Sequence, residues 1–221
     1  MIYTIGGIKG GSGKTTISTN LAVLLASKKR DVLLVDADDQ ESATDFTAFR
    51  NQALNGVLDY TAVKITGSDL NGQVNRLAEK YDDIIIDVGG RDTVSQRSAL
   101  TVSNVALFPF AARSFDIWTL NKVNALLNEV LPFNANLVCL TFINKADARG
   151  NHKDEAAELL QSSDKLIFLD TPIGNRIAFG NAAAEGLGVI ELKPADEKAA
   201  SEFRGLFSAI EKVLKKNKAK N

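Results

Sequence analysis

The sequence predicts an α/β fold with a doubly wound, mostly parallel sheet flanked by helices. Apolar runs of strand length alternate with longer helical patterns along the 221 residues. Several runs are nearly continuous Ile, Leu and Val, which is typical of parallel strands covered on both faces. Polar residues follow these runs directly, at the strand ends where ligands bind in such sheets. No repeat, linker or composition break interrupts the pattern, so we expect one domain over residues 1–221.

The strands are expected where the apolar runs lie, at residues 2–6, 31–36, 61–65, 83–87, 105–110, 136–143 and 165–169. The helices are expected at about 14–28, 41–52, 69–80, 93–103, 115–130, 152–162, 176–185 and 195–216. Strand and helix therefore alternate along the whole chain. This order predicts right-handed crossover connections between parallel strands.

Composition narrows the class of protein. The net charge is −1, so no overall field attracts the chain to nucleic acid or anionic lipid, and such binding needs a local patch. The single cysteine, Cys139, lies in an apolar run and is expected to be a buried strand residue. The first residues lack a signal-peptide pattern, and no apolar run reaches the roughly 20 residues of a membrane span. We expect a cytoplasmic protein for which membrane binding is not favoured.

The stretch "GGIKGGSGKTT", residues 6–16, has the features of a phosphate-binding loop. Its glycines let backbone N–H groups converge on a phosphate, and the helix that follows directs its positive end to the same place. Lys14 is expected to hold the β- and γ-phosphates, Thr15 to bind Mg²⁺, and Thr16 to reach the α-phosphate. The strict motif has glycine where Ile8 stands. The nucleotide-binding residues expected in this loop are Gly10, Gly11, Ser12, Gly13, Lys14, Thr15 and Thr16.

Aspartates lie at the carboxyl ends of two of the predicted strands. Asp36 and Asp38 end the run "LLVDADDQ", and Asp87 ends "DIIID". Alternate residues of a strand point to the same face, so Asp36 and Asp38 are expected to face one site. Carboxylates at strand ends are often solvated, but two at this spacing after a buried strand favour a functional role.

The stretches "KGGSGKTT", "LLVDADDQ" and "DIIIDVGG" together resemble the deviant Walker ATPases of the ParA/MinD superfamily, a group of P-loop NTPases. The resemblance covers nearly the whole chain and is strongest to small ParA-type partition ATPases. It implies ATP and Mg²⁺ as cofactors, with Thr15, Asp36 and Asp87 at the metal. The implied catalytic residues are Lys9, Lys14 and Asp38, of which Asp38 orients the attacking water.

The same resemblance explains why the loop carries a second lysine. Lys9 matches the signature lysine that reaches across a homodimer, formed on ATP binding, to the phosphates of the partner subunit. Two positions depart from the family pattern: Asp39 replaces a common proline, and "VGGRD" replaces a proline-containing segment. Within that segment, Arg91 and Asp92 are expected to pair with each other, with a contact to the partner subunit as the alternative.

Base and DNA contacts are less specific in the sequence. Asn144 in "TFINKAD" and Pro172 in "DTPIGNR" resemble base-binding segments by position, with ordinary loops as the alternative. The last helix carries an apolar stripe, expected to pack on the sheet, and a lysine-rich end. Candidate DNA contacts are Arg176, Arg204, Lys212, Lys215 and Lys216.

The leading functional hypothesis is therefore a ParA-type ATPase associated with the nucleoid. Its ATP-bound dimer would bind DNA without sequence preference and position a plasmid, a chromosome or a protein body such as a carboxysome. A ParB-like or adaptor protein would stimulate weak hydrolysis. A MinD-like membrane-associated ATPase is the alternative. A nitrogenase-iron-protein type is excluded because one cysteine cannot supply two cluster ligands per subunit. A biotin-pathway synthetase does not require lysine at position 9.

Overall fold

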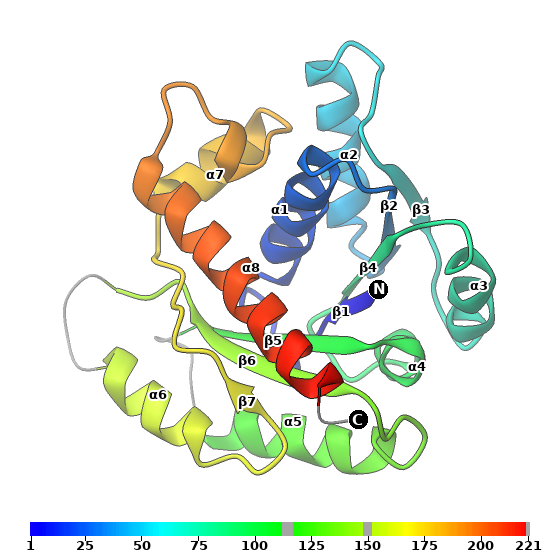
Figure 1. The fold of residues 1–221 in the computed structure, drawn as a ribbon, viewed down its shortest axis with the longest axis vertical. Coiled ribbons are helices and arrows are strands. Elements are labelled where there is room, and N and C mark those ends of the chain that lie inside the picture. The colour runs from blue at the N-terminus through cyan, green and yellow to red at the C-terminus, as the bar shows by residue number, and fades with distance from the viewer. Residues whose placement is uncertain (112–116, 148–151, 220–221) are drawn as a thin grey trace.

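The computed structural model describes residues 1–111, 117–147 and 152–219. Its centre is a seven-stranded sheet in the order β3-β2-β4-β1-β5-β6-β7, with every neighbouring pair parallel (Figure 1). The strands are β1 (Ile2–Ile5), β2 (Val32–Ala37), β3 (Thr61–Lys64), β4 (Asp83–Val88), β5 (Val105–Ala111), β6 (Val138–Asn144) and β7 (Ile167–Phe168). The predicted fold class is confirmed, and the sheet is parallel throughout.

Helices connect the strands and cover the sheet. They are α1 (Lys14–Ser27), α2 (Ser42–Ala53), α3 (Leu70–Leu77), α4 (Val94–Val102), α5 (Ile117–Val130), α6 (His152–Gln161), α7 (Ile177–Ala184) and α8 (Glu197–Lys218). Each corresponds to a helix expected from the sequence. The expected helix 115–130 begins outside the described residues. A short 3₁₀ helix at Val189–Glu191 has no counterpart in the sequence analysis.

The alternation of strand side chains divides the core between the two faces of the sheet. Leu34 of β2 and Ile85 of β4 belong to a cluster that includes residues of α1, α2, α7 and α8. Their neighbours Leu33 and Ile84 belong to a cluster with residues of α3 and α4. Both sets are buried because helices cover both faces, which explains the continuous apolar runs. Cys139 is buried beside α5, as expected, and burial raises the pKa of its thiol to about 12.

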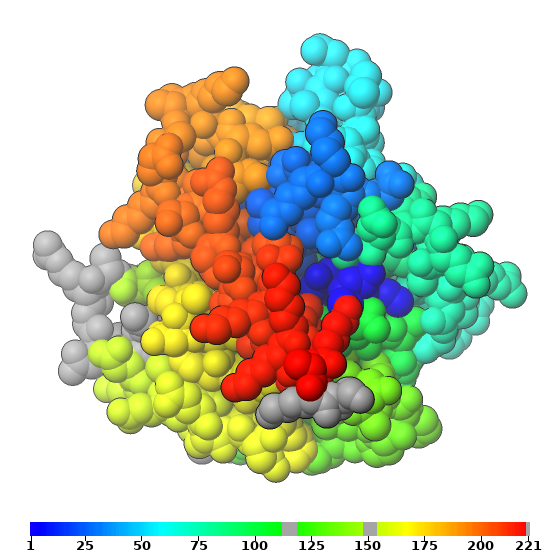
Figure 2. Space-filling model, viewed as in Figure 1, coloured from blue at the N-terminus to red at the C-terminus, as the bar shows by residue number. Residues whose placement is uncertain are grey.

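Helix α8 crosses one face of the sheet, and its outer side lies at the molecular surface (Figures 1 and 2). Its apolar stripe packs into the core, as predicted. The buried members are Phe203, Leu206, Phe207 and Ile210, and the partly buried Val213 and Leu214 pack against the same cluster. The lysine-rich end of the helix is left exposed.

Strand order brings the sequence motifs together. β1 lies between β4 and β5, and β4 lies between β1 and β2. In this register Ile5 is beside Asp87, and Asp87 is beside Asp36. The loop after β1 and both carboxylates therefore meet at one edge of the sheet, the edge formed by the carboxyl ends of the strands.

A buried arginine links α2 to the segment before α8. Arg50 is fully buried, and its guanidinium donates to both oxygens of Asp59 at 2.8 and 2.7 Å. It also donates to both oxygens of Glu191 at 2.8 and 2.9 Å, and to the Gly186 carbonyl at 3.1 Å. Burial alone would lower the Arg50 pKa, but these two carboxylates raise it above its ordinary value. The network keeps the cation charged inside the protein.

We expect Arg50→Ala to lower the free energy of unfolding by about 3–5 kcal/mol, because two carboxylates would lose their buried partner. Urea denaturation without nucleotide measures the change. Arg76→Ala is the matched control, since Arg76 is exposed on α3, and it should stay within about 0.5 kcal/mol of the wild type. Equal stability of both variants would contradict a structural role for the network.

Candidate functional site

The loop between β1 and α1 adopts a conformation that needs glycine. Gly11 and Gly13 have φ values of 76° and 90°, in the left-handed region that favours glycine. Gly13 precedes the first residue of α1, whose first turn contains no acidic side chain. The N–H groups of that turn form an N-terminal site suited to an anion.

Two side chains at the end of β6 hold the loop. Asn144, which is buried, donates through Nδ2 to the Ser12 carbonyl at 2.7 Å. Lys145 donates through Nζ to the Gly11 carbonyl at 2.8 Å. These contacts fix two carbonyls of the loop in place. The sequence analysis missed Lys145, although it follows Asn144 directly in "TFINKAD".

Lys14 lies inside the site. Its side chain is only 6% exposed, and Nζ donates to the Lys9 carbonyl at 3.2 Å. Burial lowers the pKa of Lys14, while the nearby charges of Asp87 and Asp38 oppose this change. A partly desolvated ammonium group at the start of α1 is well placed to bind phosphate oxygens.

Thr15 and Asp87 meet at the end of β4. The Thr15 hydroxyl donates to Asp87 Oδ2 at 2.7 Å, and the Ser18 hydroxyl donates to Oδ1 at 2.8 Å. Asp87 is fully buried, which raises its pKa to about 7, while the two hydroxyls oppose the shift. A hydroxyl beside a carboxylate is an oxygen donor set that fits Mg²⁺. Ser18 was missed, although it lies one helical turn after Lys14.

Asp36 has a different set of contacts from those the sequence suggested. Its Oδ1 accepts from the Asp38 N–H at 3.1 Å, and its Oδ2 accepts from the N–H and the hydroxyl of Thr44, both at 2.8 Å. The carboxylate thus anchors the first turn of α2. Asp36 borders a different hollow from Asp38, although it lies beside Asp87 in the sheet register. The assignment of Asp36 to the metal stays a prediction.

Asp38 faces the glycines that follow β4. A Cβ on Gly89 would lie 2.9 Å from Asp38 Oδ1, so glycine is needed for this approach. Asp38 also accepts from the Gln40 N–H at 3.2 Å. It borders a hollow of about 720 Å³ that the glycine-rich loop, Asp39 and the segment 89–93 also line. Asp38 therefore lies beside the place where phosphates would bind.

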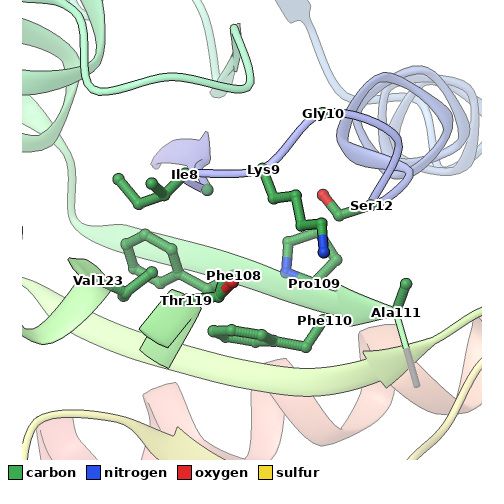
Figure 3. A pocket seen from close by; sticks show the side chains of 11 residues that line it. Ile8, Lys9, Gly10, Ser12, Phe108, Pro109, Phe110, Ala111, Thr119 and Val123 are labelled. Carbon is green, nitrogen blue, oxygen red and sulfur yellow. The ribbon is translucent and has the colours of Figure 1, made fainter. Parts of the chain in front are cut away.

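Lys9 is exposed, and it lines a different pocket from Lys14. In Figure 3 it extends over the end of β5, toward Pro109 and Phe110. These residues line a small, mainly apolar pocket with Ile8 and Ser12. Lys9 does not line the larger hollow that contains Lys14. Of the two lysines in the loop, Lys14 lines the phosphate hollow of its own chain and Lys9 does not.

A second hollow, of about 270 Å³, adjoins the loop on the side of Thr16. Asn144 lines it, as does the segment 173–176, which fits the predicted base-binding segments; Pro172 does not line it. Arg176 also lines this hollow and forms a two-point ion pair with Glu202, at 2.8 and 2.5 Å. Burial alone would raise the pKa of Glu202, but the hydrogen bonds from Arg176 lower it below its ordinary value. Arg176 therefore lies beside the hollow next to Thr16, and its guanidinium group is already paired with Glu202.

The remaining DNA candidates lie together along α8. Arg204, Lys212, Lys215 and Lys216 are all exposed. Lys28, just after α1, lies 4.1 Å from the ring centroid of Phe207, which places the second half of α8 beside the end of α1. That end of α1 is remote from the glycine-rich loop, which precedes the helix. The lysine cluster (Lys212, Lys215 and Lys216) thus lies toward the amino ends of the strands, opposite the carboxyl ends beside which phosphates would bind.

Fold and site together define the class of protein. A glycine-rich loop joins the central strand of a parallel sheet to a helix, a buried lysine begins that helix, and a hydroxyl meets an aspartate of the adjacent strand. This is a P-loop nucleotide-binding site. In agreement, the model of the CobQ/CobB/MinD/ParA nucleotide binding domain matches residues 3–189. The chain belongs to this family.

The chain is similar to proteins that position cellular cargo. It is 23% identical over 210 residues to the maintenance of carboxysome distribution protein A of Halothiobacillus neapolitanus, covering 93% of this chain and 94% of that protein. It is 28% identical over 230 residues to the chromosome partitioning protein ParA of Myxococcus xanthus, covering 86% and 80%. These relatives place it among ParA/MinD-type positioning ATPases.

The fold is also found in solved structures. The septum site-determining protein MinD of Pyrococcus horikoshii, complexed with Mg-ADP, has a TM-score of 0.70 at 19% identity, with 96% of each chain covered. A Cyanothece McdA variant of the same fold is complexed with ATP. Across the part of this chain that the structure describes, no helix has the length and apolar character of a membrane span.

We expect Gly13→Ala to lower the free energy of unfolding without nucleotide by about 1–3 kcal/mol, because of strain at positive φ and steric overlap. A Cβ there would lie 2.3 Å from Asn144 Nδ2. Gly10→Ala is the matched control, since among the described residues no atom outside its two chain neighbours lies within 4 Å of its added Cβ, and it should change stability by less than about 0.5 kcal/mol. A Gly13→Ala variant as stable as Gly10→Ala would refute this close packing of the loop on Asn144.

Proposed function

We propose that this protein is an ATP-operated switch of the ParA type. ATP closes a homodimer that binds DNA without sequence preference, and a partner protein stimulates hydrolysis and release. The observation that carries the proposal is the arrangement of Lys14, Thr15 and Asp87 at the glycine-rich loop, in a chain whose family match spans residues 3–189. The likeness to carboxysome-distribution and chromosome-partitioning proteins supports a cargo-positioning role.

Each residue of the site has a chemical role in this proposal. Lys14 and the N–H groups at the start of α1 hold the β- and γ-phosphates, and Thr16 lies beside the α-phosphate. Thr15 and Asp87 hold Mg²⁺, which neutralises charge that develops on the phosphates. Asp38 orients water for attack on the γ-phosphate. Asn144 and the segment 173–176 surround the adenine.

Dimerisation assigns a role to Lys9. Its side chain does not line the phosphate hollow of its own chain, and in this proposal it contacts the nucleotide of a partner subunit. A cation supplied in this way stabilises the charge of phosphoryl transfer, as an arginine finger does. ATP would then be needed at the interface, which makes dimer formation depend on the nucleotide.

The position of the lysine cluster on α8 supports DNA as the partner. The apolar face of α8 is packed on the sheet, which leaves its exposed lysines for a polyanion rather than an apolar face for lipid. The cluster lies far from the nucleotide site, so ATP would act on it indirectly. Two clusters joined in one dimer bind a long polyanion more tightly than separate copies do. Nucleoid association would follow from this binding.

We expect Lys14→Ala to abolish nucleotide binding, because it removes the buried cation of the loop. Asp38→Ala should keep ATP binding and stall hydrolysis, because it removes only the group that orients water. Fluorescent nucleotide titration and phosphate release measure the two effects. Hydrolysis by Asp38→Ala at the wild-type rate would show that its assigned role is wrong.

We expect DNA binding only with ATP, and weaker binding as salt rises, because counterions are released from the phosphates. A titration of nonspecific duplex DNA with ATP, ADP or no nucleotide, at two salt concentrations, tests this. Replacing Lys212, Lys215 and Lys216 by Ala should remove binding while ATP affinity stays unchanged. Binding that ignores nucleotide would contradict the switch, and co-sedimentation with anionic vesicles instead of DNA would favour the MinD-like alternative.

A further inference from the structure

The segment after β4 brings a cation into the phosphate hollow. Arg91 lines this hollow together with Lys14, Thr15 and Asp38 of the same chain. We propose that Arg91 contacts the γ-phosphate of the nucleotide bound to its own chain, and so distinguishes a triphosphate from a diphosphate. This inference rests on the proposed function, since it presumes that the hollow binds ATP.

Close backbone packing sets the position of Arg91. The preceding residue, Gly90, lies directly against the glycine-rich loop: a Cβ on it would be 2.7 Å from both Cα and N of Gly10. A larger residue would push the two segments apart. The chain therefore reaches position 91 at the edge of the loop that surrounds the phosphates.

A buried glutamine fixes the same segment from the other side. Gln96 is fully buried, and its Oε1 accepts from the Gly7 N–H at 2.9 Å. Its Nε2 donates to the Arg91 carbonyl at 3.4 Å, and its own N–H donates to the Thr93 hydroxyl at 3.1 Å. One side chain thus connects the start of the glycine-rich loop to the backbone of Arg91. Gln96 is a positioning residue for this arginine.

The adjacent carboxylate is bound elsewhere. Asp92 accepts from Arg97 at both oxygens, at 2.8 and 2.7 Å, and Arg97 also donates to Glu129 at 2.5 Å. The predicted Arg91–Asp92 pair is therefore wrong, because Arg97 in the first half of α4 binds both carboxylate oxygens of Asp92. Arg91 remains exposed at the hollow and is not neutralised by its sequence neighbour.

The charges around the hollow favour an added phosphate. Asp38 and Asp39 line it beside Arg91, and Lys14 and Lys145 are its other cations. Lys14 is directed to the Lys9 carbonyl and Lys145 to the Gly11 carbonyl, both within the loop. A guanidinium group can give two parallel hydrogen bonds to phosphate oxygens. Arg91 thus offers the hollow a cation whose side chain is not directed at a carbonyl of the loop, and in this proposal it binds the terminal phosphate.

The test compares ATPγS with ADP, by titration of each against the full-length protein with Mg²⁺ at concentrations where it is monomeric. Arg91→Ala should weaken ATPγS binding by about tenfold to about a hundredfold, the range of one or two charge-assisted hydrogen bonds. Its ADP affinity should change by less than about twofold. Arg91→Lys should recover part of the loss, because it keeps the charge without the planar fork.

Arg76→Ala on α3 is the matched control and should leave both affinities unchanged. Equal weakening of ATPγS and ADP by Arg91→Ala would overturn the proposal, and so would no change in either. Gln96→Leu also removes the acceptor of the Gly7 N–H in the loop, so it should weaken both nucleotides, but ATPγS more than ADP, which a purely structural role would not produce. If the wild type binds neither nucleotide, the proposed function itself fails, whereas a normal wild type with an unaffected Arg91→Ala refutes only the role of Arg91.

Discussion

The contact between the first turn of α1 and the buried carboxylate of Asp87 is the interaction on which this site depends. Thr15 and Ser18 donate to its two oxygens, so the helix that follows the glycine-rich loop is tied to the adjacent strand β4. Without these hydroxyls a carboxylate would be buried with no donor, which is costly. The same contact places Lys14 at the phosphate hollow and brings together a hydroxyl and a carboxylate, an oxygen donor set that fits a magnesium ion. The position of the loop and of its lysine thus depends on one pair of hydrogen bonds.

The loop is held from several directions by other parts of the chain. Asn144 and Lys145 hold its carbonyls from β6, Gln96 holds Gly7 from α4, and Gly90 packs on Gly10. A preformed loop loses little conformational freedom on binding, which favours affinity. The segment after β4, which carries Arg91, packs on the loop at Gly10, and Asp38 after β2 lies against Gly89 of that segment. The two segments are therefore in contact with each other beside the phosphate hollow.

The sequence predicted much of the site because the loop motif is local. The spacing of Lys14 and Thr15 after three glycines defines the phosphate-binding place, and strand periodicity locates Asp87 at the end of its strand. Contacts between distant segments were not predictable in the same way. Nothing near Asp36 indicated that Thr44 would occupy its carboxylate, and nothing near Arg176 indicated its pairing with Glu202 on α8. The two residues of each pair belong to different elements, and their spacing along the chain follows no helix or strand period. The sequence pattern therefore does not indicate the contact.

By itself, the sequence determined the alternation of strand and helix, the burial of the sheet on both faces and the chemistry of the glycine-rich loop, since each follows from local periodicity or from glycine geometry. Tertiary structure alone decided which side chains hold that loop, which arginine binds Asp92, and that Lys9 lines a different pocket from the hollow that contains Lys14. The physical reason is that strand order, not chain order, sets neighbours: β4 and β6 follow β1 at a long distance along the chain, yet their ends lie beside the loop after β1.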